Sequence, residues 1–186
     1  MLIDQQHYKL QRILIVGPPG AGKSSFGKKL AKCLNQPLYH LDDYYWLPSW
    51  QRIDERQWRQ RLRELCGNKS WIIDGNHAKT FAQRAIYADT IVMLDYSPLL
   101  CLWRFCKRSI KRFFKINDNL PINIQNDPTH KPIFSIQWHI ISLILKYRFK
   151  TKDEMLKISN TIGCNIVILK SDKHSEKFLN HCKSYN

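Results

Sequence analysis

A glycine-rich segment, residues 17–24, has the residue types and spacing of a phosphate-binding loop. Gly17, Gly22, Lys23 and Ser24 satisfy the pattern G-x-x-x-x-G-K-[ST], with an apolar run before it and a helical pattern after it. Glycines let backbone N–H groups approach phosphate oxygens, the lysine spans the outer phosphates, and the serine hydroxyl ligates Mg²⁺. We therefore predict nucleotide-binding residues at Gly17, Pro18, Pro19, Gly20, Ala21, Gly22, Lys23, Ser24 and Ser25.

A basic helix, expected to begin near Pro98, is the second segment whose residues could take part in chemistry. At 3.6 residues per turn one basic face contains Arg104, Arg108, Lys111, Arg112 and Lys115, opposite Leu99, Leu102, Cys106, Ile110 and Phe113. Three interpretations compete: guanidinium groups of an active site, a surface for nucleic acid or anionic lipid, and a solvated face. We assign Arg104 and Arg108 to the active site, with Arg148 as a further nucleotide-binding guanidinium, and leave the remaining lysines and arginines to solvent or an acidic partner.

The elements that must position these residues follow from the hydrophobic pattern. Short apolar runs predict strands, each followed by a helical or glycine-rich segment, at residues 12–16, 37–41, 70–73, 90–94 and 165–169. Helices are expected after Ser24, over 54–66, from Pro98 and before Cys182. Alternating strands and helices predict a parallel sheet covered on both faces, an α/β/α fold. One insertion, residues 117–132, is rich in proline and polar residues and is expected to lie outside the core.

Two classes of phosphate-loop protein are disfavoured by what the sequence lacks. Ring ATPases carry an acidic pair at the end of a strand, but the candidate strands end in Asp74-Gly75 and Asp95-Tyr96. GTPases carry N-K-x-D, and Asn68-Lys69-Ser70 is followed by Trp71. The remaining class transfers a phosphoryl group to a bound acceptor, a reaction that uses basic residues and the exclusion of water.

The chain resembles the adenylate kinase-like group of nucleoside monophosphate and small-molecule kinases. The resemblance rests on the loop, on Asp74-Gly75, and on Asp95 followed by Arg104 and Arg108. More closely, residues 39–50, 71–76 and 102–104 resemble a bacterial branch labelled topology-modulation (FlaR-type) proteins. The family implies one kinase-like domain over residues 1–186 with five parallel core strands in the order 2-3-1-4-5. It also implies an acceptor-binding region near 38–68 and a lid near 109–133.

The resemblance also implies roles for individual residues. Related hydroxyl kinases such as shikimate kinase use an aspartate after the second strand to orient or deprotonate the acceptor hydroxyl, the position of Asp42; a turn or cap is the structural alternative. Asp74 would hold Mg²⁺ through water, and a role as a helix N-cap is its structural alternative. For Asp95, capping of the following helix competes with a role in the site. Arg104 would lie near the adenine ring and Arg108 near the phosphates.

A departure from the family bears on the acceptor. Adenylate kinases follow the D-G pair with F-P-R, whose arginine grips the acceptor phosphate, whereas here Asn76, His77, Ala78 and Lys79 follow. The segment 42–50 is acidic and aromatic. This composition favours a hydroxylated or ring-containing acceptor over AMP, although the aromatic residues could instead form a small satellite core.

Composition narrows the possible partners. Thirty Lys and Arg against fifteen Asp and Glu leave a formal charge of +15 over 186 residues, so anions are the expected partners. No apolar run reaches the 18 residues of a spanning helix, no signal-peptide core is present, and a cytoplasmic location is expected. Six cysteines without C-x-x-C spacing favour buried thiols over disulfides or zinc.

The main hypothesis is an ATP- and Mg²⁺-dependent small-molecule kinase with Lys23, Asp42, Arg104 and Arg108 as catalytic residues and Ser24 and Asp74 at the metal. The alternative is an ATP-binding or ATPase module that associates with DNA or another polyanion, for which the sequence carries charge but no recognition motif. A third possibility is peripheral membrane docking by residues 98–115.

Overall fold

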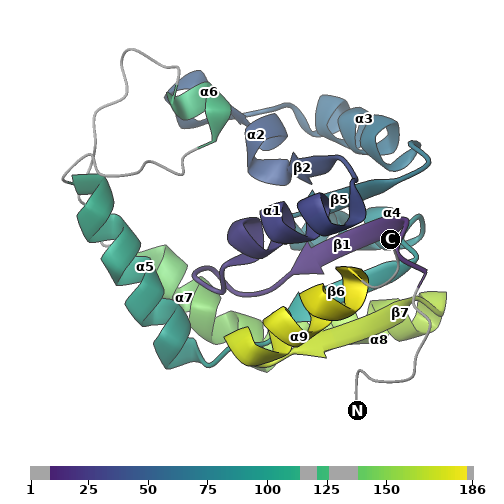
Figure 1. Ribbon diagram of the computed structural model, residues 1–186. Helices are drawn as coiled ribbons and strands as arrows, with labels where there is room; N and C mark the ends of the chain where they lie inside the picture. The colour runs from purple at the N-terminus through teal and green to yellow at the C-terminus, as the bar shows by residue number, and fades with distance from the viewer. Residues whose placement is uncertain (1–8, 114–120, 126–137, 184–186) are drawn as a thin grey trace.

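The computed structural model describes residues 9–113, 121–125 and 138–183, and its centre is a parallel sheet of five strands (Figure 1). The sheet order is β2-β5-β1-β6-β7, which reads 2-3-1-4-5 when the five core strands are counted along the chain. The predicted three-layer fold class is therefore confirmed. These strands span Arg12–Val16 (β1), Leu38–His40 (β2), Trp71–Asp74 (β5), Thr90–Leu94 (β6) and Asn165–Leu169 (β7).

The sheet is buried on both faces because its strands are apolar at successive positions. In β1, Ile13 and Ile15 belong to one hydrophobic cluster while Leu14 and Val16 belong to another. Successive side chains of a strand point to opposite faces, so these are the two layers that flank the sheet.

Helices cover both layers. Helices α1 and α9 contribute to the first cluster, and α3, α4 and α8 to the second. The α-helices span Lys23–Leu34 (α1), Leu41–Tyr45 (α2), Glu55–Cys66 (α3), Phe81–Ala85 (α4), Pro98–Phe113 (α5), Ile122–Gln125 (α6), Trp138–Lys146 (α7), Lys152–Ile162 (α8) and Asp172–Lys183 (α9). Smaller elements are a hairpin of Trp46–Leu47 (β3) and Gln51–Arg52 (β4), the 3₁₀ turns Pro48–Trp50 (η2) and Ala78–Thr80 (η3), and the π-helical turn Tyr147–Thr151 (η4).

The strand order places the loop after β1 at the centre of the sheet's carboxyl edge. Strand β1 pairs with β5 on one side and β6 on the other, so the segments that follow all three strands meet there. Ligands of open α/β sheets bind at this edge, where neighbouring connections diverge. The fold therefore brings the glycine-rich loop, the Asp74 segment and the start of α5 together.

Helix α5 buries side chains other than those of the apolar face that lies opposite its basic face. Leu99, Cys106 and Ile110 of that apolar face are exposed. Cys101 and Phe105 are buried instead, and Arg104 and Arg108 on the same side are half-buried. The helix is turned with Arg104 and Arg108 toward the glycine-rich loop, because Cys101 packs against Gly20 of that loop.

The 117–132 insertion lies only partly within the described residues. Its described part forms α6, and Ile124 of this helix is fully buried, in contrast to the expectation that the insertion contributes nothing to the core. Within the part of the chain that the structure describes, no helix combines the length and apolarity needed to cross a bilayer.

Candidate active site

The glycine-rich loop joins β1 to α1 and takes its shape from two left-handed glycines. Gly22 (φ 84°) forms the N-cap of α1, and Gly20 (φ 83°) lies so close to α5 that a Cβ atom there would be 2.9 Å from the carbonyl carbon of Cys101. Only glycine fits such a position without strain. The loop therefore directs the N-terminus of α1 toward the carboxyl edge of the sheet. The free N–H groups of a helix N-terminus favour the binding of anions there.

Lys23 is held against the loop that precedes it. Its Nζ donates to the carbonyl oxygens of Gly17 (2.8 Å) and Pro18 (3.1 Å). Burial lowers the pKa of Lys23, while the nearby carboxylates of Asp74 and Asp42 act in the opposite direction. The ammonium group therefore lies near both aspartates that the sequence singled out.

Asp74 joins the loop to two neighbouring strands. Ser24 Oγ donates to Asp74 Oδ2 (2.7 Å), and Nδ1 of His40, at the end of β2, lies 2.9 Å from the same oxygen. The hydrogen bond to Asp74 raises the pKa of His40 above its ordinary value. Asp74 thus contacts side chains and is no helix cap, and His40 is a site residue that the sequence analysis did not predict.

The Ser24–Asp74 pair has the chemistry of a Mg²⁺ site. Asp74 is 5% exposed, and its Oδ1 atom, buried among the described residues, accepts no hydrogen bond. A hydroxyl and a carboxylate with a free oxygen suit a hard cation that keeps water and phosphate as its other ligands. Within the described residues, no group of three or more His, Cys, Asp and Glu side chains is placed to hold a metal ion by itself.

Asn76 and Arg84 shape the edge of the sheet beside the loop. Asn76 accepts from Gly17 N through Oδ1 (3.0 Å) and donates to Gly17 O through Nδ2 (2.8 Å). Arg84, fully buried on α4, donates to the carbonyl oxygens of Gly75 (3.1 Å) and Asn76 (2.5 Å). Burial lowers the pKa of Arg84 to about 10. The Asn76 side chain thus contacts the glycine-rich loop.

Asp42 lies at the start of α2 with its carboxylate beside His77. Asp42 Oδ1 is 3.1 Å from His77 Nε2, and the His77 ring contacts Tyr45 (centroids 4.6 Å apart) and Trp58 (5.2 Å). Desolvation is the largest influence and would raise the pKa of Asp42, but the hydrogen bond and charge of His77, together with Lys23, give a net downward shift. The Asp42 carboxyl is therefore ionised at neutral pH.

Asp43 has a different position from Asp42. Its Oδ1 accepts from the backbone N of Ile122 (3.0 Å), and its carbonyl oxygen accepts from Asn123 Nδ2 (3.1 Å). Asn123 also donates to Trp46 O (2.8 Å). Asp43 thus holds α6 over the α2 region, and this long-range contact carries no local sequence signal.

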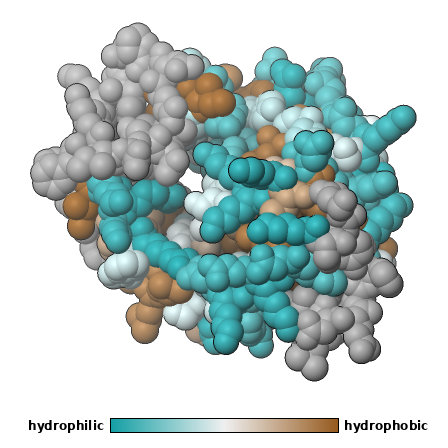
Figure 2. Space-filling view, in the orientation of Figure 1, coloured by the Kyte–Doolittle hydropathy of each residue, from teal (hydrophilic) through white to brown (hydrophobic). Residues whose placement is uncertain are grey.

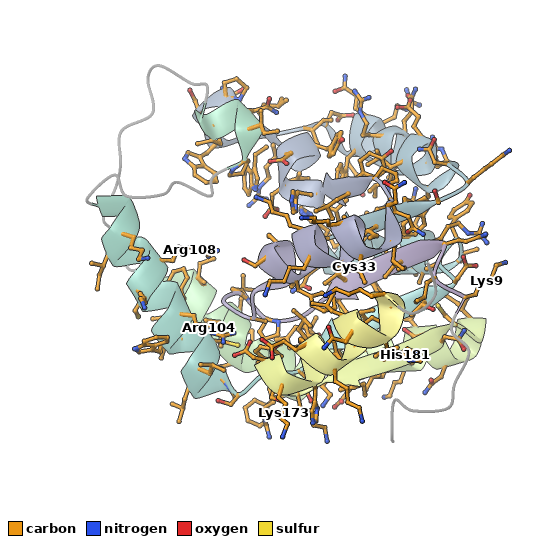
Figure 3. The ribbon with its side chains drawn as sticks, viewed as in Figure 1. Lys9, Cys33, Arg104, Arg108, Lys173 and His181 are labelled. Carbon is orange, nitrogen blue, oxygen red and sulfur yellow. The ribbon has the colours of Figure 1, made fainter. Side chains whose placement is uncertain are left out.

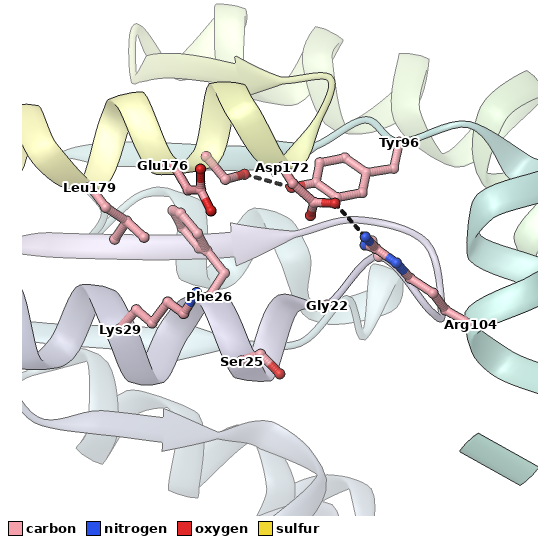
Figure 4. A pocket seen from close by; sticks show the side chains of 11 residues that line it. Gly22, Ser25, Phe26, Lys29, Tyr96, Arg104, Asp172, Glu176 and Leu179 are labelled. Carbon is pink, nitrogen blue, oxygen red and sulfur yellow. Dashed lines mark hydrogen bonds and ion pairs between the residues drawn. The ribbon is translucent and has the colours of Figure 1, made fainter. Parts of the chain in front are cut away.

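Arg104 borders a hollow of about 450 Å³ between the loop, α5 and α9 (Figure 4). Its guanidinium donates to Asp172 Oδ2 (2.5 Å) and lies 5.4 Å from the centre of the Tyr96 ring. The hollow is lined by Ala21, Gly22, Ser25, Phe26, Lys29, Tyr96, Arg104, Asp172, Ser175, Glu176 and Leu179. Its position beside Gly22 and its mixed aromatic and polar lining suit a heterocyclic base joined to phosphates in the loop.

The remaining basic residues differ in how close they come to this edge. Arg108 extends from the same side of α5 as Arg104 (Figure 3), and its positive charge lowers the pKa of Lys23 slightly further. Arg148 is exposed on η4 and is not among the described residues that line the hollow. Lys152 forms an ion pair with Asp95 (2.7 Å). The cap of α5 is Ser97 and not Asp95, because Ser97 Oγ accepts from the N–H of Leu100 (3.2 Å).

Comparison with solved structures places this arrangement in a known fold. A shikimate kinase from Acinetobacter baumannii in complex with shikimate superimposes with a TM-score of 0.56 and 19% identity, covering 93% of this chain and 90% of that one. A shikimate kinase from Bacteroides thetaiotaomicron gives a TM-score of 0.54 and 15% identity, covering 94% and 97%. This chain has the fold of those kinases. The predicted P-loop fold is thereby confirmed.

Comparison by sequence is more limited. A shikimate kinase from Rhodococcus jostii (strain RHA1) is 52% identical over 31 residues, which is 17% of this chain and 18% of that enzyme. The match thus spans less than a fifth of the curated relative, and no family model matches the chain.

Proposed function

We propose that this protein is an ATP- and Mg²⁺-dependent phosphotransferase that acts on a small acceptor with a hydroxyl group. One observation carries the proposal: Lys23, the Ser24–Asp74 pair and the Asp42 carboxylate converge at one edge of the sheet, so that both aspartates act on the Lys23 charge. Donor-phosphate, metal and acceptor groups are needed together for phosphoryl transfer, and a nucleotide-binding module alone has no need of Asp42 at this edge.

We assign each group of site residues a role in the reaction according to its position. Backbone N–H groups of the loop and Lys23 would bind the ATP phosphates, and the hollow beside Arg104 would take the base. Ser24 and Asp74 would hold Mg²⁺, which neutralises phosphate charge when bound. Arg108, on the inner side of α5, would stabilise charge on the transferring phosphoryl group, because a guanidinium offers several donors in a fixed fork.

The acceptor would bind between Asp42 and the aromatic side chains around His77. An ionised Asp42 orients the attacking hydroxyl, and a loose phosphoryl-transfer transition state needs positioning more than a strong base. The Tyr45 ring packs edge-on against Trp46 (centroids 5.1 Å apart) and against Trp58 (5.2 Å), and the three rings give this region an apolar wall. We infer a hydroxylated acceptor, and shikimate heads the compounds to test because the similar structures are shikimate kinases.

The test is an ADP-release assay with ATP and Mg²⁺ over shikimate, other hydroxy acids, nucleosides, nucleoside monophosphates and sugars. We expect one class to stimulate turnover, and Asp42→Asn to lower kcat by about 10² to 10⁴. Asp54→Asn is the matched control, because Asp54 caps α3 on the surface and asparagine caps equally well. Lys23→Ala should abolish turnover. Wild-type turnover in Lys23→Ala, or hydrolysis that is unaffected by every acceptor and by Asp42→Asn, would contradict the proposal.

The regional assignments belong to the same proposal. Residues 38–68 include α2, the β3–β4 hairpin and α3, which surround Asp42, and we assign them to acceptor binding. Most of the lid expected at 109–133 lies outside the described residues. Its described parts are the end of α5 and α6, and α6 rests on Asp43 and Trp46. The closeness to topology-modulation proteins likewise remains part of the proposal.

A further inference from the structure

The outer side of α5 presents apolar side chains to solvent. Leu99, Trp103 and Ile110 are 80%, 57% and 50% exposed, and Cys106 is exposed between them. Their spacing of four, three and four residues places them on one stripe of the helix, which we name the outer α5 face. Figure 2 shows hydrophobic patches along the edge of the molecule formed by this helix.

Basic side chains flank this stripe. Lys107 and Lys111 line a shallow hollow of about 380 Å³ together with Trp103, Cys106 and Ile110. Lys107 Nζ lies 4.9 Å from the centre of the Trp103 ring, so a charge and an aromatic ring occupy the same spot on the surface. The sequence contains no acidic residue from Tyr96 to Asn117. The outer α5 face is therefore apolar in its centre and positive at its margin.

We propose that the outer α5 face docks on the surface of a phospholipid bilayer that contains anionic lipids. Helices that lie in the plane of a membrane interface bury Trp, Leu and Ile among the acyl chains while Lys and Arg contact anionic headgroups. Two other occupants fit the surface less well. Nucleic acid would leave Leu99 and Ile110 without a role, and a second copy of a chain with charge +15 would bring two basic stripes together.

The orientation of α5 is compatible with this docking. Arg104 and Arg108 project from the opposite side of the helix, toward the glycine-rich loop. A bilayer against the outer α5 face would leave the candidate active site outside the lipid. The docking surface is thus separate from the residues of the proposed kinase, and its test does not depend on ATP or an acceptor.

The test is co-sedimentation of the full chain with sucrose-loaded vesicles. One set is phosphatidylcholine alone and the other contains about a third phosphatidylglycerol, both at near-physiological salt. We expect binding to the anionic vesicles, and at least about tenfold weaker binding for Leu99→Ser combined with Trp103→Ser. Lys107→Glu combined with Lys111→Glu should weaken binding by at least about 25-fold, since each lysine near an anionic surface contributes about fivefold.

Matched controls separate the face from general stickiness and charge. Ile86→Ser removes an apolar side chain that is 66% exposed after α4, and Lys32→Glu combined with Lys69→Glu removes equal charge elsewhere; the apolar control should bind as wild type and the charge control nearly so. Circular dichroism and unfolding midpoints would verify that each variant folds.

Several results would overturn the docking proposal. These are no binding to anionic vesicles, equal binding to neutral vesicles, and binding that the Leu99 and Trp103 substitutions leave unchanged, which would indicate adsorption through net charge alone. A dimer that Trp103→Ser dissociates, without vesicle binding, would assign the face to a second copy. Duplex DNA binding lost in the same variants, again without vesicle binding, would assign it to nucleic acid.

Discussion

His77 illustrates how one side chain can set the properties of another. It lies in a left-handed backbone conformation (φ 31°) after β5, and this turn places its ring between Tyr45, Trp58 and the Asp42 carboxylate. A single histidine in a sequence is an uncertain signal, and we did not assign it a role from sequence. In the structure it is the group that holds Asp42 in place and favours its ionised form.

We expect His77→Asn to change the pH dependence of the proposed reaction. Asparagine tolerates a positive φ but is too short to reach Asp42, so the pKa of Asp42 should rise. Because the reaction needs ionised Asp42, activity in the variant should be lost at a higher pH on the acidic side than in wild type. A profile of kcat/KM from about pH 4 to pH 8 would show this shift.

Two comparisons complete that test. Asp42→Asn should lack the ionisation altogether, and the urea-unfolding free energy of His77→Asn would separate lost ring packing from the altered pKa. An unchanged acidic limb in a folded His77→Asn protein would mean that His77 only packs.

At the level of elements, the contact between the glycine-rich loop and α5 determines how the donor site is built. Gly20 is not one of the four residues that define the loop pattern, yet it is where α5 meets the loop. The strands and helices themselves were largely predictable, because β1, β6 and β7 have uninterrupted apolar runs and Asp54 marks the start of α3. The rotation of α5 was not, because both of its sides carry apolar residues at helical spacing.

We expect Gly20→Ala to weaken ATP binding and to lower the free energy of unfolding by about 2 to 4 kcal/mol, from the left-handed backbone and the clash with Cys101. Gly163→Ala is the matched control, since Gly163 also has a positive φ (75°) but a Cβ there would meet nothing within 4 Å. Its cost should be about 1 to 2 kcal/mol, without a change in ATP affinity. Urea unfolding and nucleotide titration measure both. Equal losses in the two variants would show that the contact with α5 is unimportant.

At the level of the whole molecule, the charge of +15 must be tolerated by a single small fold. A few carboxylates neutralise basic groups at the site and sheet edges, as Asp89 does for Arg12 (3.0 Å), Asp172 for Arg104 and Asp95 for Lys152. The remaining positive charges repel one another, and the repulsion between exposed groups is screened by salt.

We therefore expect the thermal midpoint of the protein to rise by a few degrees between about 20 and 300 mM NaCl, since about 1 kcal/mol corresponds to about 2 to 4 °C for a chain of this size. Sodium acetate at the same ionic strength is the control for specific chloride binding in the glycine-rich loop. A midpoint that falls with both salts would mean that attractive ion pairs outweigh the net repulsion.

Local sequence pattern was sufficient for the strand-loop-helix unit around Gly17 to Ser24, because this unit depends on near neighbours in the chain and on burial of an apolar run. The sheet order followed only from the resemblance to the adenylate kinase-like group. The partners of these residues depended on tertiary structure. Asp74 meets Ser24 and His40 across 50 and 34 positions, and Asp43 meets Ile122 across 79. Such contacts form only when the parallel strands bring their carboxyl ends together, and only packing against the loop decides which side of α5 remains in solvent.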